Sequence, residues 1–188
     1  KNLYIRFSEV KRNFGNKTTW DAPFEVHFRQ FVHEANEAVF SNGRENKALH
    51  LDVFDIRGDF DLVYIDTPYI AHSGIGVDYF GFYHFLEGLV NYSQWPNMID
   101  YKTKHKRLKN GRSVWTDKNK IYSAFDRLFE KFRNSILVIS YRADGIPSVN
   151  ELIELLKKYK TSVKELNRTA YKYVLSLNNS AEVLLIGK

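Results

Sequence analysis

Hydrophobic side chains recur at intervals of three and four residues in two long stretches of this chain, which predicts amphipathic helices there. The first covers residues 24–40, with apolar positions at Phe24, Phe28, Phe31, Val32, Ala35 and Val39. Ser41-Asn42-Gly43 is expected to end it. The second covers residues 118–132, with apolar positions at Ile121, Phe125, Leu128, Phe129 and Phe132.

Two further helices are expected. The pattern of residues 80–92 predicts a helix inside a segment, residues 70–116, that is otherwise rich in loops. Ser148 is followed three residues later by Glu151, which is the spacing of a capping box. A helix should therefore begin after Ser148 and run to about Tyr159.

Apolar runs and alternating segments predict strands between and after these helices. The expected strands are residues 48–53, 62–65, 136–140, 162–166, 171–176 and 181–186, with turns at Arg57-Gly58-Asp59 and Asn178-Asn179. Helices and strands alternate in the middle of the chain, and hairpins close it. This order predicts an α/β sheet with an antiparallel edge.

The strand at residues 62–65 ends abruptly in Asp66-Thr67-Pro68-Tyr69, called the 66–69 turn below. Ligand sites in open α/β sheets form at the carboxyl ends of strands. Pro68 stiffens the turn, which can therefore hold a carboxylate and an aromatic ring at a set distance. That arrangement suits a planar substrate with an amine, stacked on Tyr69 and bonded to Asp66 and a backbone carbonyl. An ordinary strand-ending turn is the alternative.

Composition narrows the class of protein. The 188 residues are 44% hydrophobic and 15% aromatic, which predicts one folded domain over residues 1–188 with a sizeable core. There is no cysteine, so disulfides and thiolate metal sites are excluded; no histidine or carboxylate spacing indicates a metal site. No apolar run reaches the roughly 18 residues of a membrane-spanning helix.

Positive charge is concentrated in residues 102–112. The net charge of the chain is +6, which suits a polyanionic partner. The segment contains Lys102, Lys104, Lys106, Arg107, Lys109 and Arg112, with His105 and no acid. A solvated or disordered loop is one interpretation. A loop that contacts DNA phosphates beside an active site is the other, and its position after the 66–69 turn, between Trp95 and Trp115, favours it.

The 66–69 turn resembles the Asp-Pro-Pro-Tyr motif of the Dam-like (D12 class) adenine-N6-specific DNA methyltransferases, with Thr67 in place of the first proline. The resemblance extends in order along nearly the whole chain. Asn13-Phe14-Gly15-Asn16-Lys17 and the following helix are similar to the region after that family's target-recognition part. The aromatic-rich residues 78–85, the strand and its exit at residues 136–142, and the tail at residues 171–186 resemble the later segments.

This resemblance implies a fold and a set of partners. The fold would be a partial Rossmann-like S-adenosylmethionine methyltransferase sheet with helices on both faces and a C-terminal antiparallel hairpin. Residues 1–23 would end the recognition region, and residues 70–117 would face DNA. The expected partner is double-stranded DNA, without a membrane, in the cytoplasm of a bacterial-type cell.

The resemblance also implies roles for individual residues. Asp66 would accept a hydrogen bond from the N6 amine of a flipped-out adenine, with the carbonyl of Thr67 as second acceptor, while Pro68 stiffens the turn and Tyr69 stacks on the base. Asp66 and Asp52 would contact the cofactor, S-adenosylmethionine; a plain turn acid is the alternative for Asp52. The residues expected to approach DNA are Arg12, Asn13, Lys17, Lys102, Lys104, Lys106, Arg107 and Arg112.

One departure from the family is large. Its glycine-rich cofactor loop, Phe-x-Gly-x-Gly, should precede the 66–69 turn, but the only close glycine pair is Gly74 and Gly76, which follow it. The acid that binds the cofactor ribose is missing for the same reason. We therefore expect the carboxyl-terminal part of a larger methyltransferase, with an incomplete cofactor site and the missing amino-terminal part as a partner. The alternatives are a non-catalytic nucleic-acid-binding remnant of the fold, or methylation of RNA or of a protein side-chain amide.

Three more features have two interpretations each. The aromatic residues between Tyr79 and Phe85 either line a pocket for the target base or belong to the core. His84 lies among them, where a structural role is the expected one. Arg142 follows a buried strand and either meets a phosphate or the base, or is a plain surface arginine.

Overall fold

The computed structural model describes residues 6–7, 13–14, 21–74, 76, 78–109, 113–171 and 180–188. The chain forms two compact units, Lys1–His50 and Leu51–Lys188. The second unit contains the sheet and the 66–69 turn.

Within the described residues of the first unit lie a two-stranded ladder and helix α2. Strands β1 (Arg6–Phe7) and β2 (Asn13–Phe14) pair antiparallel. Helix α2 (Phe24–Glu37) confirms the helix expected from the apolar spacing, although none of its residues is buried. The exposed Arg29–Glu25 ion pair and the Gln30–Glu34 hydrogen bond, both at helical spacing of four, support it along its polar side.

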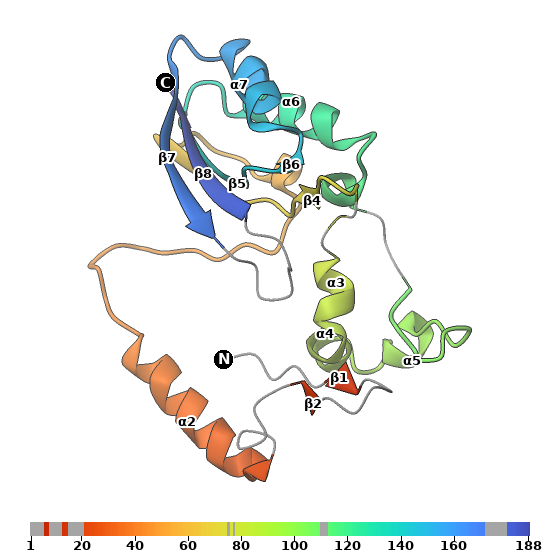
Figure 1. Ribbon diagram of the computed structural model, residues 1–188. Helices are drawn as coiled ribbons and strands as arrows, with labels where there is room; N and C mark the ends of the chain where they lie inside the picture. Colours follow the sequence, from red (N-terminus) through yellow and green to blue (C-terminus); the bar gives the residue numbers. More distant parts are fainter. Residues whose placement is uncertain are drawn as a thin grey trace. The chain divides into compact units, whose positions relative to one another are not determined.

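The second unit is built on a four-stranded mixed sheet (Figure 1). Its order is β3 (Leu62–Ile65), β5 (Ile136–Arg142), β8 (Ser180–Gly187) and β7 (Val163–Tyr171). β3 runs parallel to β5, whereas β8 is antiparallel to both β5 and β7. The predicted α/β sheet with a closing antiparallel pair is confirmed.

Helices α6 (Ile121–Lys131) and α7 (Val149–Lys157) cover one face of this sheet and form the core with it. Alternate residues of β5 and β8 point to the helices, because side chains on a strand alternate between its two faces. The strand residues of this core are Ile65, Leu137, Ile139, Tyr141, Val183 and Leu185. From the helices come Ile121, Phe125, Leu128, Phe129, Leu152 and Leu156.

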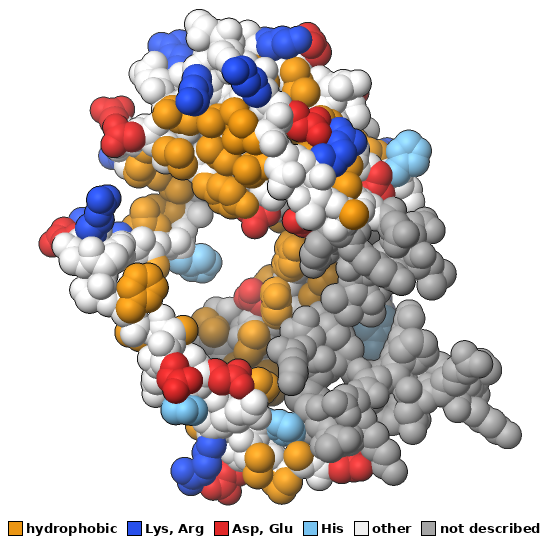
Figure 2. Space-filling model, turned by 60° about the vertical axis from the view of Figure 1, so that its left-hand side comes forward, with side chains coloured by type: hydrophobic (Ala, Val, Ile, Leu, Met, Phe, Trp, Pro, Cys, Tyr) orange, Lys and Arg blue, Asp and Glu red, His pale blue; other side chains and the backbone are white. Residues whose placement is uncertain are grey.

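The opposite face of the sheet is apolar but incompletely covered. It carries the half-buried residues Ile136, Val138, Leu184 and Ile186, and the exposed residues Leu62 and Tyr64. Leu62 and Tyr64 are 53% and 58% exposed, so β3 is only partly the buried strand that its composition suggests. Helices on both faces were expected, whereas α6 and α7 lie on the same face. Hydrophobic side chains gather on the surface of the part of the molecule that contains the sheet (Figure 2).

The prediction of a strand at residues 48–53 is wrong. A single turn of 3-10 helix, η1 (Val53–Asp55), follows an irregular segment in which Leu49 and Leu51 are exposed. The carboxylate of Asp52 accepts a hydrogen bond from the N–H of Phe54 (2.9 Å) and so begins the helical turn. Local bonds of this kind compete with strand formation when no neighbouring strand pairs with the segment, and the described residues supply none.

Other boundaries differ from the predicted ones in smaller ways. The helix expected over residues 80–92 is two helices, α3 (Tyr79–Phe82) and α4 (His84–Val90), followed by α5 (Trp95–Met98). β7 contains most of the strand expected at residues 162–166 and continues to Tyr171, with an irregularity between Glu165 and Asn167, so only the first residue of the strand expected at residues 171–176 is described. Residues 172–179, with the turn at Asn178-Asn179, lie outside the described residues. Among the described helices, none has the length and apolar character needed to cross a membrane.

The capping box that begins α7 is present as predicted. The N–H of Glu151 donates to Oγ of Ser148 (3.3 Å), and the N–H of Ser148 donates to the Glu151 carboxylate (2.7 Å). The hydroxyl of Ser148 also donates to this carboxylate (2.8 Å), and the two bonds that the carboxylate accepts from Ser148, first the backbone one, lower the pKa of Glu151 below its ordinary value. The hydroxyl of Tyr122 on α6 also donates to this carboxylate (3.1 Å), so the cap joins the two core helices.

Replacing Ser148 with alanine removes the hydroxyl that accepts from the N–H of Glu151. We expect S148A to lower the free energy of unfolding by about 1 kcal/mol, measured by urea denaturation. S123A is the matched control, because the hydroxyl of Ser123 is exposed on α6 and bonds only within that helix. Its effect should stay within about 0.5 kcal/mol. Equal losses from the two variants would contradict a specific role for the cap.

The capping carboxylate also predicts a pH dependence. Because the pKa of Glu151 is lowered in the folded state, its stabilising bonds are fully present above the ordinary pKa of 4.5 and disappear as the pH falls through the folded value. E151Q should therefore destabilise the protein near neutral pH, and this difference should shrink at pH values below 4.5. Denaturation of both proteins across that range measures it; a difference that is constant with pH would refute the carboxylate's part.

Candidate active site at the carboxyl end of β3

The 66–69 turn leaves the sheet beside the exit of β5. β3 and β5 are parallel and pair Ile65 with Ile139, so their carboxyl ends lie at the same edge of the sheet. Asp66 is exposed at this edge, directly after the buried Ile65. β5 continues past its last pair with β3 as far as Arg142. An exposed carboxylate therefore lies where open α/β sheets form ligand sites.

Tyr69 is held by the last two residues of β5, Tyr141 and Arg142. The ring of the buried Tyr141 meets the Tyr69 ring edge to face, with 6.2 Å between centroids and 88° between planes. The hydroxyl of Tyr141 donates to the carbonyl of Ile146 (2.6 Å). The guanidinium carbon of Arg142 lies 5.4 Å from the Tyr69 centroid. Tyr69 is half-buried, and its ring is held by two neighbours that lie next to each other on β5.

A short ladder ties the chain after the 66–69 turn to the chain after β5. β4 (Ile70–Ala71) pairs antiparallel with β6 (Gly145–Ile146). Gly145 allows this approach, because a Cβ there would lie 2.6 Å from Cε1 of Tyr141 and 2.9 Å from Cγ of Arg142. The turn is thus anchored at both ends, by β3 before it and by β4 after it.

Arg142 is held by the carboxylate of Asp144, which follows it by two residues just after β5. Its Nε and Nη2 donate to the two oxygens of Asp144 at 2.7 and 2.8 Å, and Oγ of Ser180 on β8 contacts Oδ1 of Asp144 at 2.5 Å. The bonded guanidinium is the main reason that the pKa of Asp144 falls to about 2. Of the two interpretations of Arg142 from the sequence, the plain surface arginine does not fit, since its side chain is only 11% exposed.

Thr67 is the residue in which this turn departs from the Asp-Pro-Pro-Tyr motif. Its hydroxyl oxygen is buried and has no hydrogen-bond partner among the described residues. A buried hydroxyl without a partner costs about 1–3 kcal/mol. The strand-to-turn exit therefore contains a polar group that a bound molecule or water can satisfy.

Asp52 has a structural role in the folded chain. It is exposed and caps η1 through one carboxylate oxygen. That matches the turn-acid interpretation, and its contact with a cofactor stays a prediction.

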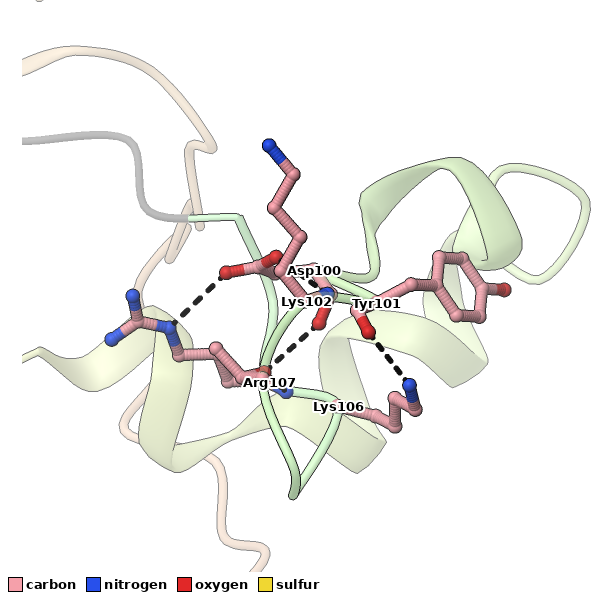
Figure 3. A network of polar contacts seen from close by, with 6 residues as sticks. Asp100, Tyr101, Lys102, Lys106 and Arg107 are labelled. Carbon is pink, nitrogen blue, oxygen red and sulfur yellow. Dashed lines mark hydrogen bonds and ion pairs between the residues drawn. The ribbon is translucent and has the colours of Figure 1, made fainter.

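Hydrogen bonds order residues 102–109 into a turn whose basic side chains are exposed to solvent (Figure 3). Asp100 organises it: its N–H donates to the carbonyl of Arg107 (2.7 Å), and its carboxylate accepts from the N–H of Lys102 (3.1 Å) and lies 3.6 Å from Nε of Arg107. Nζ of Lys106 donates to the carbonyl of Tyr101 (2.7 Å). The fully buried Leu108, bridged to Ile99, anchors the turn.

The DNA-contact residues predicted from sequence are only partly visible in the structure. Lys102, Lys104, Lys106 and Arg107 are all exposed on the ordered turn. Arg112, Arg12 and Lys17 lie outside the described residues, and Asn13 is placed only as part of β2. Their contact with DNA, and the position of the basic turn beside the 66–69 turn, stay predictions.

The aromatic segment at residues 79–85 is mostly exposed, and Phe80 is half-buried. Tyr79, Phe82, Tyr83 and Phe85 are all exposed, so the core interpretation does not fit them. His84 is half-buried, with its ring 5.8 Å from that of Trp95 and nearly perpendicular to it, as expected for a structural histidine.

Sequence patterns did not predict the residues that support the 66–69 turn from β5, β6 and β8. Tyr141, Asp144, Gly145 and Ser180 had no assigned role, although each contacts a site residue or its neighbour. The spacing Arg142-x-Asp144 followed by glycine is the one signal that marks a charged turn after a buried strand.

Several characterised proteins are similar to the chain. The Type II methyltransferase M2.HphI of Haemophilus parahaemolyticus is 30% identical over 138 residues, which are 72% of this chain and 36% of that protein. The Modification methylase StsI of Streptococcus sanguinis is 28% identical over 145 residues, 76% of this chain and 21% of that protein. The Modification methylase LlaI of Lactococcus lactis subsp. lactis is 30% identical over 137 residues, 72% of this chain and 20% of that protein.

The similarity covers most of this chain but much less than half of each relative. No protein-family model matches the chain, and no solved structure matches it. Over most of its length, the chain is therefore homologous to part of the type II methyltransferases and modification methylases.

Proposed function

We propose that this chain carries the substrate-amine site of an enzyme that transfers a methyl group from S-adenosylmethionine to N6 of adenine in DNA. The observation that carries the proposal is the anchored 66–69 turn, which presents an exposed carboxylate and a held aromatic ring at the carboxyl end of β3. Homology to type II methyltransferases and modification methylases supports it.

The chemistry follows from the donors and acceptors of the turn. The target adenine leaves the duplex and stacks on Tyr69, a contact worth about 1–3 kcal/mol per base. The carboxylate of Asp66 and the carbonyl of Thr67 accept the two N–H bonds of the exocyclic amine. They thereby point the nitrogen lone pair at the incoming methyl group and stabilise the positive charge that grows on N6. The extra proton then passes from N6 to solvent.

The residues present fit one side of a cofactor site. S-adenosylmethionine supplies the methyl group, and Asp66 is the residue of this chain that would face it. The unpartnered hydroxyl of Thr67 is a polar group left for a bound molecule at the same place. The glycine-rich loop of the family has no counterpart in the sequence, and we propose that the rest of the cofactor site comes from another part of a longer enzyme.

The two edges of the sheet support the proposal that a further part completes this fold. β7 exposes one large apolar residue, Leu166, but surrounds it with Lys164, Glu165 and Arg168, which are charges of the kind that protect a natural edge strand. β3, at the other edge, exposes Leu62 and Tyr64. An edge strand with exposed large apolar residues is a pairing site. An additional strand beside β3, and a cover for its apolar face, would come from the amino-terminal part of a longer methyltransferase.

DNA is the proposed acceptor because the exposed cations of the ordered turn at residues 102–109 suit phosphates. The absence of a glycine-rich loop favours a second candidate, a non-catalytic nucleic-acid-binding remnant of the fold. RNA, or a protein side-chain amide, is the alternative acceptor. Labelled methyl from S-adenosylmethionine, supplied with unmethylated DNA, RNA or protein, distinguishes these, and nucleoside analysis identifies the methylated atom.

The chain alone and the gene product with any sequence encoded upstream of Lys1 should differ in that assay. We expect label in N6-methyladenine only with the extended polypeptide, because this chain lacks the glycine-rich loop. Label in another base or in protein would refute the adenine assignment. No label with either form would favour the non-catalytic candidate.

D66A should abolish transfer by the active polypeptide, because the amine loses its charged acceptor. A loss of at least about 100-fold in kcat is expected, with little change in DNA affinity. D61A is the matched control, since Asp61 is an exposed acid at the opposite end of β3. Near-normal turnover of D66A would refute the role of Asp66 as the acceptor for the substrate amine.

The open edge of β3 predicts a difference in amide exchange. Backbone amides of Leu62–Ile65 that do not donate to β5 should exchange rapidly in this chain and about 100-fold or more slowly in the extended polypeptide. Amides on the outer side of β7 should exchange equally in both. Equal exchange at β3 in both forms would show that no further strand pairs there.

A further inference from the structure

We propose that Arg142 is a positioning residue: held by Asp144 and Ser180, it fixes the plane of the Tyr69 ring and so the plane of the base that stacks on it. This inference rests on the proposed function, in which Tyr69 receives the target base. It adds a support for the 66–69 turn that comes from β5 and β8.

The first step is the geometry of the cation over the ring. The guanidinium carbon of Arg142 lies 5.4 Å from the Tyr69 centroid, within the roughly 6 Å over which a cation is attracted to an aromatic ring. The side chain is 11% exposed, so water screens this attraction less than at an open surface. The second neighbour, Tyr141, meets the ring edge to face. Together they restrict the tilt of the Tyr69 ring.

The second step is what fixes the guanidinium itself. Its two parallel bonds to Asp144, at 2.7 and 2.8 Å, form the bidentate fork that only arginine can make. Asp144 is held in turn by Ser180, from a different strand. The low pKa of Asp144, about 2, keeps it charged throughout the physiological range. The guanidinium plane therefore has one orientation, which a flexible lysine would not maintain.

The third step links this plane to the reaction. A base stacks parallel to its aromatic partner, so the tilt of Tyr69 sets where the exocyclic amine lies relative to Asp66. Displacing a reacting group by about 1 Å can cost about 100-fold in rate. Arg142 thus acts on transfer through Tyr69 and not by touching the base.

The test compares two arginines that each donate two hydrogen bonds to one carboxylate. Arg168 on β7 makes a similar fork with Glu165, at 2.8 and 3.1 Å, and none of the aromatic rings among the described residues lies over its guanidinium. In the full-length gene product, R142Q should lower kcat for DNA methylation about 10- to 100-fold, with KM for DNA changed less than about threefold. D144N should give a smaller loss of the same kind, and R168Q should leave both constants unchanged. An R142Q enzyme with normal kcat would overturn the inference.

A double-mutant cycle separates positioning from a general structural role. If Arg142 acts through Tyr69, adding R142Q to Y69A should lower kcat by less than about threefold further. A full additional loss in the Y69A background, together with a fall in thermal midpoint that R168Q does not share, would overturn the inference.

A measurement on this chain that needs no activity completes the test. With ¹³C-labelled tyrosine, R142Q should shift the ring signals of Tyr69 and speed its ring flips, whereas R168Q should not. Unchanged Tyr69 signals in R142Q would overturn the inference even in a protein that methylates nothing. If the extended wild-type polypeptide methylates no acceptor while Tyr69 still responds to R142Q, the proposed function is refuted and the positioning contact stands.

Discussion

Tyr141 is the side chain on which the core and the candidate site both depend. Its ring packs against Phe125 of α6 at 5.6 Å and against Tyr69 at 6.2 Å, and its hydroxyl donates to the carbonyl of Ile146. One buried aromatic residue thereby joins the helical layer, the end of β5 and the turn that leaves β3. Because interiors are tightly packed, the position of the exposed turn is determined by the core beneath it.

The sequence predicted those elements whose residues are decided locally. Leu62–Ile65, the helix beginning after Ser148 and the apolar stripe of α6 agree with the structure, because period and capping are properties of short segments. The strand expected at residues 48–53 failed for the opposite reason: a strand exists only where another strand pairs with it, and no local pattern shows that. Asp52 instead satisfied the backbone of its own turn.

The same distinction between local and long-range contacts separates the site residues that the sequence predicted from those that it did not. Asp66 and Tyr69 could be singled out from the sequence, since a strand followed by a stiff turn is a local pattern. The sequence left two roles open for Arg142 and predicted none for Asp144 and Ser180, because their contacts depend on β8 lying beside β5. The cluster of basic residues at 102–112 predicted a charge but not a conformation. Asp100, the acid that shapes the turn at residues 102–109, lies just outside this cluster.

The β4–β6 ladder has a consequence for how the site forms during synthesis. Ile70 can pair with Ile146 only after the whole intervening segment, including α6 and β5, has been made and folded. Contacts between distant positions form slowly because the entropy of closing a long loop must be lost first. The ribosome therefore releases the 66–69 turn well before its anchor exists. A nascent chain would carry the residues of the candidate site in an unorganised state, and their arrangement would appear late, together with the second half of the sheet.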